Sequence, residues 1–84
     1  MKGEPYLNRK QFIENYGGVS QKAQELNNVM RKAKNLLDLG QLGLNYHFIF
    51  NKVDSDPGMT DEQVTRYAEQ IEKIYREILK KAVL

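Results

Sequence analysis

The side chains that could carry chemistry gather around a loop near residue 55. Four carboxylates lie there, on Asp54, Asp56, Asp61 and Glu62, and carboxylate oxygens are ligands that Ca²⁺ prefers. Their spacing lacks the ligand pattern and the terminal glutamate of an EF-hand loop. Loop solubility and helix capping explain all four residues, so we expect no metal site.

Catalytic groups are equally sparse. The sequence has no cysteine and a single histidine, His47, which excludes thiolate chemistry and the usual multi-histidine metal sites. Ser20 and His47 are the only nucleophile and base worth pairing, and no surrounding motif marks either residue. Gly40 and Gly43 are not followed by the lysine of a phosphate-binding loop. We therefore predict a protein that is not an enzyme, with no catalytic residues, cofactor or small-molecule substrate.

Length and composition predict one small globular domain that spans residues 1–84. Hydrophobic residues make up 40% and charged residues 29% of the 84 positions, a balance typical of globular chains. No apolar run approaches the roughly 20 residues that cross a bilayer. Residues 1–6 lack the apolar core of a secretory signal. We expect a cytoplasmic protein without a membrane partner.

Two helices are predicted in the N-terminal half. Asn8 is a good N-cap for a short helix over about 9–16. Gly17 and Gly18 end it, because glycine adopts positive φ without a Cβ penalty. Ser20 then caps a second helix over about 21–39, with Gly40 as its stop. Its apolar positions are spaced by three and four residues, at Ala23, Leu26, Met30, Ala33 and Leu37.

The third main helix is predicted over about 61–82. It follows a loop that contains Pro57 and Gly58, and Thr60 with Gln63 forms a capping box at its start. One stripe of this helix consists of Val64, Tyr67, Ile71, Ile74 and Ile78. We expect this stripe to pack antiparallel against the second helix. The first helix closes one end through Phe12, Ile13 and Tyr16.

Residues 44–50 fit two structures. Leu44, Tyr46, Phe48 and Phe50 alternate as a strand does. One helical face also fits the segment, and its residues are Leu42, Tyr46, Ile49, Phe50 and Val53. A strand needs a partner for its backbone hydrogen bonds, and a helix does not, which favours the helix slightly. The expected fold is an all-α bundle of three main helices with a short helix or strand at about 44–50.

Residues 9–30 are similar to a helix-turn-helix motif. A short helix, Gly17 at the turn, and apolar residues at Ala23 and Leu26 match the pattern. Ile13 and Gly18 depart from it, since a small residue and an apolar residue are usual at those positions. The similarity implies that the helix opening at Ser20 enters the major groove of double-stranded DNA.

The charge distribution is compatible with this hypothesis. Residues 1–40 carry seven basic and four acidic side chains, a net charge of +3, whereas the remaining residues sum to −1. Glutamine pairs with adenine, and lysine reaches guanine or phosphate. The first functional hypothesis is a small DNA-binding regulator of phage or plasmid type. Its DNA contacts would be Arg9, Lys10, Gln21, Lys22, Gln24, Arg31 and Lys32.

The alternative hypothesis is a protein-interaction module: an adaptor, inhibitor or assembly factor. Two striped helices and the aromatic residues Tyr46, Phe48 and Phe50 provide more apolar surface than a minimal hairpin hides. The excess would dock a protein partner or a second copy in a homodimer. The two hypotheses differ in what must be exposed, which is a basic patch for DNA and an apolar patch for docking.

Overall fold

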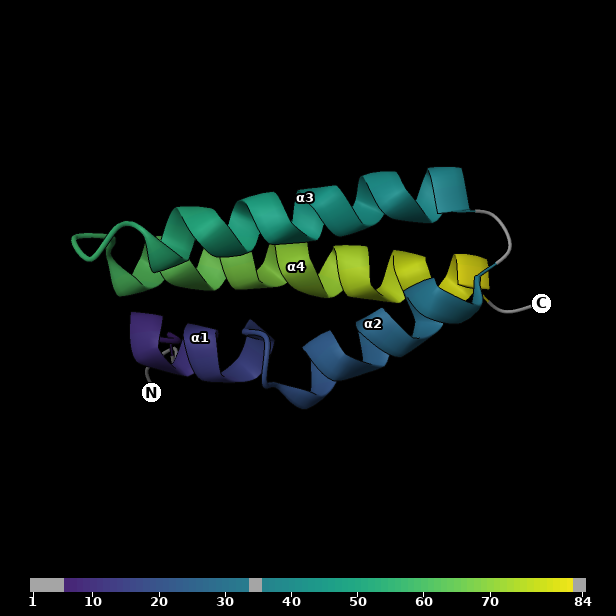
Figure 1. The fold of residues 1–84 in the computed structure, drawn as a ribbon. Helices are drawn as coiled ribbons and strands as arrows, with labels where there is room; N and C mark the ends of the chain where they lie inside the picture. The colour runs from purple at the N-terminus through teal and green to yellow at the C-terminus, as the bar shows by residue number, and fades with distance from the viewer. Residues whose placement is uncertain (1–5, 34–35, 83–84) are drawn as a thin grey trace.

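The computed structural model describes residues 6–33 and 36–82, and within these ranges the chain forms four helices and no strand. They are α1 (Arg9–Tyr16), α2 (Gln21–Lys32), α3 (Leu36–Asp54) and α4 (Asp61–Ala82). α3 and α4 form a long antiparallel hairpin, and α1 and α2 follow one another along α4 (Figure 1). The predicted small all-α bundle is confirmed.

Local capping signals fix where three helices begin. The Asn8 side chain accepts a hydrogen bond from the Gln11 backbone N–H at 2.8 Å, and the Gln11 side chain accepts one from Asn8 at 3.0 Å. Ser20 Oγ accepts from the Ala23 N–H at 3.1 Å. The Thr60–Gln63 capping box forms as predicted, with bonds of 3.2 and 3.3 Å. Each cap satisfies donors that have no partner inside the helix.

α1 ends at Gly17 as predicted, but the reason differs from the expected one. Gly17 has φ −74° and ψ 174°, an extended conformation open to any residue. A Cβ there would lie 2.5 Å from the backbone oxygen of Ile13, closer than real Cβ atoms approach. The glycine is therefore required for steric room rather than for positive φ.

The second helix is shorter than the predicted 21–39. It ends at Lys32, and Ala33 is extended with φ −70° and ψ 138°; positions 34 and 35 of the predicted helix lie outside the described residues. α3 then runs back along α4 from Leu36, straight through Gly40 and Gly43. Glycine inside a helix costs up to about 1 kcal/mol, and burial of a large apolar side chain contributes about 1.5–3 kcal/mol. Packing against α4 therefore outweighs the two glycines.

Residues 44–50 belong to this 19-residue α3, so the helical alternative was the correct one and its predicted length was too short. α3 is the main partner of α4, a place that we had assigned to the second helix. Leu39, Ile49 and Val53 pack there against the stripe of α4. The core residues are Phe12, Tyr16, Leu26, Leu39, Tyr46, Ile49, Val53, Val64, Ala68, Ile71 and Ile78.

Candidate interaction surfaces

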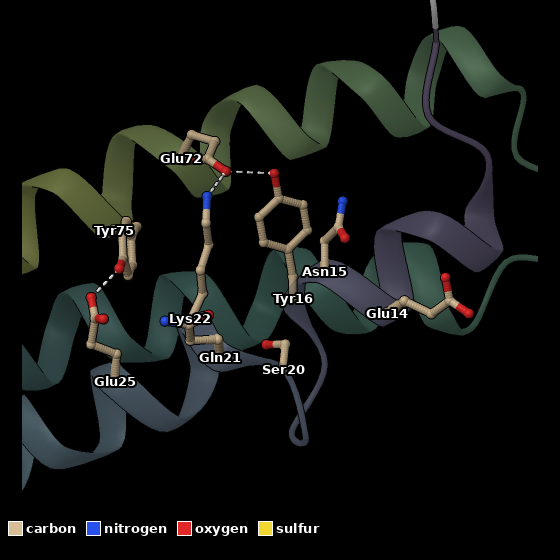
Figure 2. A pocket seen from close by; sticks show the side chains of 9 residues that line it. All are labelled: Glu14, Asn15, Tyr16, Ser20, Gln21, Lys22, Glu25, Glu72 and Tyr75. Carbon is tan, nitrogen blue, oxygen red and sulfur yellow. Dashed lines mark hydrogen bonds and ion pairs between the residues drawn. The ribbon is translucent and has the colours of Figure 1, made fainter.

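Lys22, one of the predicted DNA contacts, points toward α4. Its ammonium group forms an ion pair with the Glu72 carboxylate. It also lies 5.4 Å from the ring centroid of Tyr16 and 5.1 Å from that of Tyr75. Figure 2 shows the lysine side chain extended between the two rings. Both the carboxylate and the aromatic rings attract the ammonium charge.

Hydroxyl groups join these contacts into one polar cluster, which consists of Tyr16, Lys22, Glu25, Glu72 and Tyr75. Tyr16 Oη donates to the same Glu72 oxygen at 2.7 Å, and Tyr75 Oη donates to Glu25 (Figure 2). The residues surround a recess of about 520 Å³. Tyr16 lies on α1, Lys22 and Glu25 on α2, and the other two on α4. The cluster therefore joins three helices.

The pKa values show which protonation states the cluster holds. Burial by itself raises the pKa of Glu72, but hydrogen bonds from Lys22 and Tyr16 and the charges of Lys22 and Arg76 outweigh it, so the pKa lies below its usual value. Burial and the bond to Glu72 raise the pKa of Tyr16. The bond to Glu25, together with burial, raises the pKa of Tyr75 to about 12. Glu72 is thus an anion and both tyrosines are neutral donors at neutral pH.

Arg9, the second basic residue expected at DNA, caps the end of α3. Its Nε donates to the Val53 carbonyl at 3.1 Å, and the guanidinium also donates to the Asp54 carbonyl. The Asp54 carboxylate lies 3.9 Å away. Terminal carbonyls of a helix have no partner inside it and carry partial negative charge, which a cation stabilises. Arg9 therefore ties α1 to α3.

The other predicted DNA contacts lie at the surface of α1 and α2. Gln24 donates to the Val19 carbonyl at 3.2 Å within the turn region. The five exposed residues of the set are Lys10, Gln21, Gln24, Arg31 and Lys32. Of the predicted DNA contacts, Arg9 and Lys22 therefore bind other residues of the fold, and the others lie at the solvent-exposed surface.

The three predicted docking residues have three different surroundings. Tyr46 is buried, and its hydroxyl donates to the Tyr16 carbonyl at 3.2 Å. Phe50 is half-buried and stacks on Phe12, with 5.9 Å between ring centroids. Tyr46 and Phe50 also line an apolar recess of about 440 Å³ between α2 and α3. Phe48 alone is largely exposed, at 63%.

Phe48 belongs to an exposed apolar stripe on α3, made of Leu37, Leu44 and Phe48. Leu37 is 88% and Leu44 66% exposed, and spacings of seven and four place the three residues on one helix face. We expected Leu37 in the core of a longer second helix, which was wrong. The sequence pattern places Leu44 in the segment 44–50, which fits a helix or a strand. Periodicity did not reveal this stripe because α3 is apolar on more than one side.

A groove between α3 and α4 adjoins the stripe and has a volume of about 430 Å³. Apolar atoms from Phe48, Ile49 and Ile74 line it. Its charged lining residues are Lys52 and Lys73. Lys52 Nζ lies 5.4 Å from the Phe48 ring centroid. The groove therefore meets the stripe at Phe48, and its charged side chains are basic.

The remaining candidate chemistry has structural explanations. The His47 ring nitrogen lies 3.0 Å from the Asn51 side-chain amide one turn away, and Ser20 serves as the cap of α2. In the described ranges 6–33 and 36–82, no three histidine, aspartate or glutamate side chains group as metal ligands. Over the same ranges, no helix is both long and apolar enough to span a membrane.

Comparisons with protein-family models, with curated proteins and with solved structures found no match to this chain, so its fold and surfaces are the basis for any assignment of function.

Proposed function

We propose that this protein is a non-enzymatic interaction module that binds another protein through the outer face of α3. The observation that carries the proposal is the exposed stripe of Leu37, Leu44 and Phe48. Scattered exposed apolar residues are normal, but a contiguous apolar face marks a docking surface. Aromatic side chains such as that of Phe48 are enriched in the cores of protein interfaces.

The geometry gives the DNA-binding hypothesis less support. Lys22 is neutralised by Glu72, and Arg9 is bound to the end of α3. Lys10, Arg31 and Lys32 remain for phosphate contacts. DNA affinity that rests on so few cations depends weakly on salt, because each neutralised phosphate releases about one counterion.

Site-specific photo-cross-linking tests the proposed surface. A benzophenone side chain is introduced at Phe48, a site already aromatic and exposed, in the cells that encode the protein. The matched control carries the same group at Val19, which is 87% exposed but lies in the turn between α1 and α2. We expect an adduct with a second protein from position 48 and none from position 19.

The cross-link must also depend on the rest of the stripe. Leu44→Gln removes an apolar contact without a charge, and we expect it to reduce the adduct from position 48 at least several-fold. An adduct that is insensitive to Leu44→Gln, or equally strong from Val19, contradicts the proposal. An adduct with the protein itself identifies a second copy as the occupant, and sedimentation of the pure protein then measures the homodimer.

Sedimentation with duplex DNA at low and high salt separates the two hypotheses. An interaction module gives the same sedimentation coefficient with and without duplex. A duplex-dependent shift that weakens as salt rises would favour the DNA-binding regulator instead.

A further inference from the structure

Resting on the proposed function, we infer that the partner presents an acidic amphipathic helix, which lies along α3 and places its carboxylates near Lys52 and Lys73. The groove beside Phe48 is basic. Its lining contains these two lysines and no acidic residue. An occupant with negative charge beside an apolar face matches this surface in both respects.

Neither lysine is neutralised within the described part of the chain. The ion pairs Arg9–Asp54, Lys22–Glu72 and Arg66–Glu62 do not include either of them. Glu69 lies one turn before Lys73 on α4, and none of these ion pairs joins the two residues. Two unpaired cations beside an apolar surface repel a basic partner and attract an acidic one.

The dimensions of the surface fit a helix. Leu37 and Phe48 are eleven positions apart, which corresponds to roughly 16 Å or three turns of a helix. Gly40 lies between Leu37 and Leu44, and a Cβ built there would have no heavy atom within 4 Å. The centre of the stripe therefore has room for the side chains of an approaching helix.

The groove between α3 and α4 is the feature that favours a helix over an anionic membrane. Phe48, Ile49 and Ile74 line an open groove between α3 and α4, beside the exposed outer face of α3. Side chains of a helix insert into such a groove, whereas a lipid surface lies over convex apolar groups. The structure therefore favours a protein helix, and lipid binding becomes an outcome of the test.

Three synthetic peptides of about four helical turns serve as probes. Each peptide carries leucines on one face and a fluorescent label. The residues that flank the leucine face are glutamate in the first peptide, glutamine in the second and lysine in the third. Fluorescence anisotropy measures their affinity for the full chain at low and high salt. We expect the glutamate peptide to bind about five- to tenfold more tightly than the glutamine peptide at low salt, with the difference shrinking at high salt.

The variant Lys52→Glu, Lys73→Glu should abolish this preference. Its matched control is Lys10→Glu, Lys32→Glu, which changes the net charge equally at exposed positions on α1 and α2. We expect the control to retain the preference. Thermal unfolding followed by circular dichroism verifies that both variants fold.

Four outcomes overturn the inference: equal loss in both double variants, equal binding of acidic and neutral peptides, tighter binding of the basic peptide, or no binding of any peptide. Phosphatidylglycerol vesicles are the lipid probe, and binding to them without peptide binding identifies a membrane surface instead. Each of these outcomes leaves the Phe48 cross-link as an independent measure, so failure of the acidic partner is distinguishable from failure of the interaction surface.

Discussion

Two apolar stripes on neighbouring helices have opposite surroundings. On α4, Val64, Ile71 and Ile78 are completely buried. On α3, Leu44 and Phe48 are mostly exposed although they belong to a helix that packs tightly on α4. The stripe of α4 is covered by α3, and no other described element covers the outer face of α3. Spacing therefore identifies an apolar face, whereas tertiary packing decides whether that face stabilises the fold or remains exposed for a partner.

The two aromatic-associated lysines show the same contrast. Lys22 lies beside the rings of Tyr16 and Tyr75 and is paired with Glu72. Lys52 lies beside the ring of Phe48 without an ion pair in the described chain. The first lysine stabilises contacts among helices. The second keeps its charge available at the surface.

The largest expected effect is at the buried stripe. Ile71→Ala should lower the free energy of unfolding by about 2–5 kcal/mol, because it removes buried methyl groups and leaves a cavity. Chemical denaturation measures this loss. Leu44→Ala is the matched control on the exposed stripe, and its effect should stay within about 0.5 kcal/mol. Similar losses for both variants would mean that Leu44 is packed in solution.

The polar cluster should respond next most strongly. Glu72→Gln keeps the size of the side chain but leaves Lys22 and Tyr16 without their anionic partner. We expect a loss of about 1–2 kcal/mol, reduced from the buried-pair value because both side chains of the ion pair are partly exposed. Glu69→Gln, at an exposed position of α4, should be nearly neutral. An unchanged free energy of unfolding in Glu72→Gln would contradict the stabilising role of the cluster.

Alanine substitutions at Gly40 and Gly43 test how much space lies beside α3 at each position. Gly40→Ala should stabilise the protein by about 0.5–1 kcal/mol, since alanine favours the helix and a Cβ would have open space. Gly43→Ala should gain less, because its Cβ would lie 3.2 Å from Met30 Cε. Thermal unfolding compares the two. A loss of stability in Gly40→Ala would show that the outer face of α3 is covered.

The smallest expected effect is the pH dependence of the stability that Glu72 contributes. The folded pKa of Glu72 is below its ordinary value of 4.5, so its contribution to stability is complete above that pH and is lost as the pH falls through the folded pKa. The groups that lower it are Lys22 on α2, Tyr16 on α1 and Arg76 on α4. The difference in unfolding free energy between wild type and Glu72→Gln should therefore shrink below about pH 4.5. A constant difference down to pH 2 would exclude Glu72 as its source.

Local sequence signals determined the helical class, the starts of α1, α2 and α4, the loop with Pro57 and Gly58, and the buried stripe of α4. Caps act over about three residues, and periodicity follows from the helix geometry itself, so neither needs the rest of the fold. They left open the structure of residues 44–50, because a short apolar run fits a helix or a strand.

Only the tertiary structure decided that the chain reverses after Ala33, that α3 continues through Gly40 and Gly43, and that Lys22 points toward Glu72. Glu72 is fifty positions from Lys22, and no local pattern connects them. The same holds for the outer face of α3, whose exposure depends on which surface α4 covers. Burial and charge pairing are properties of neighbours in space, and the sequence by itself states only which residues are available to become neighbours.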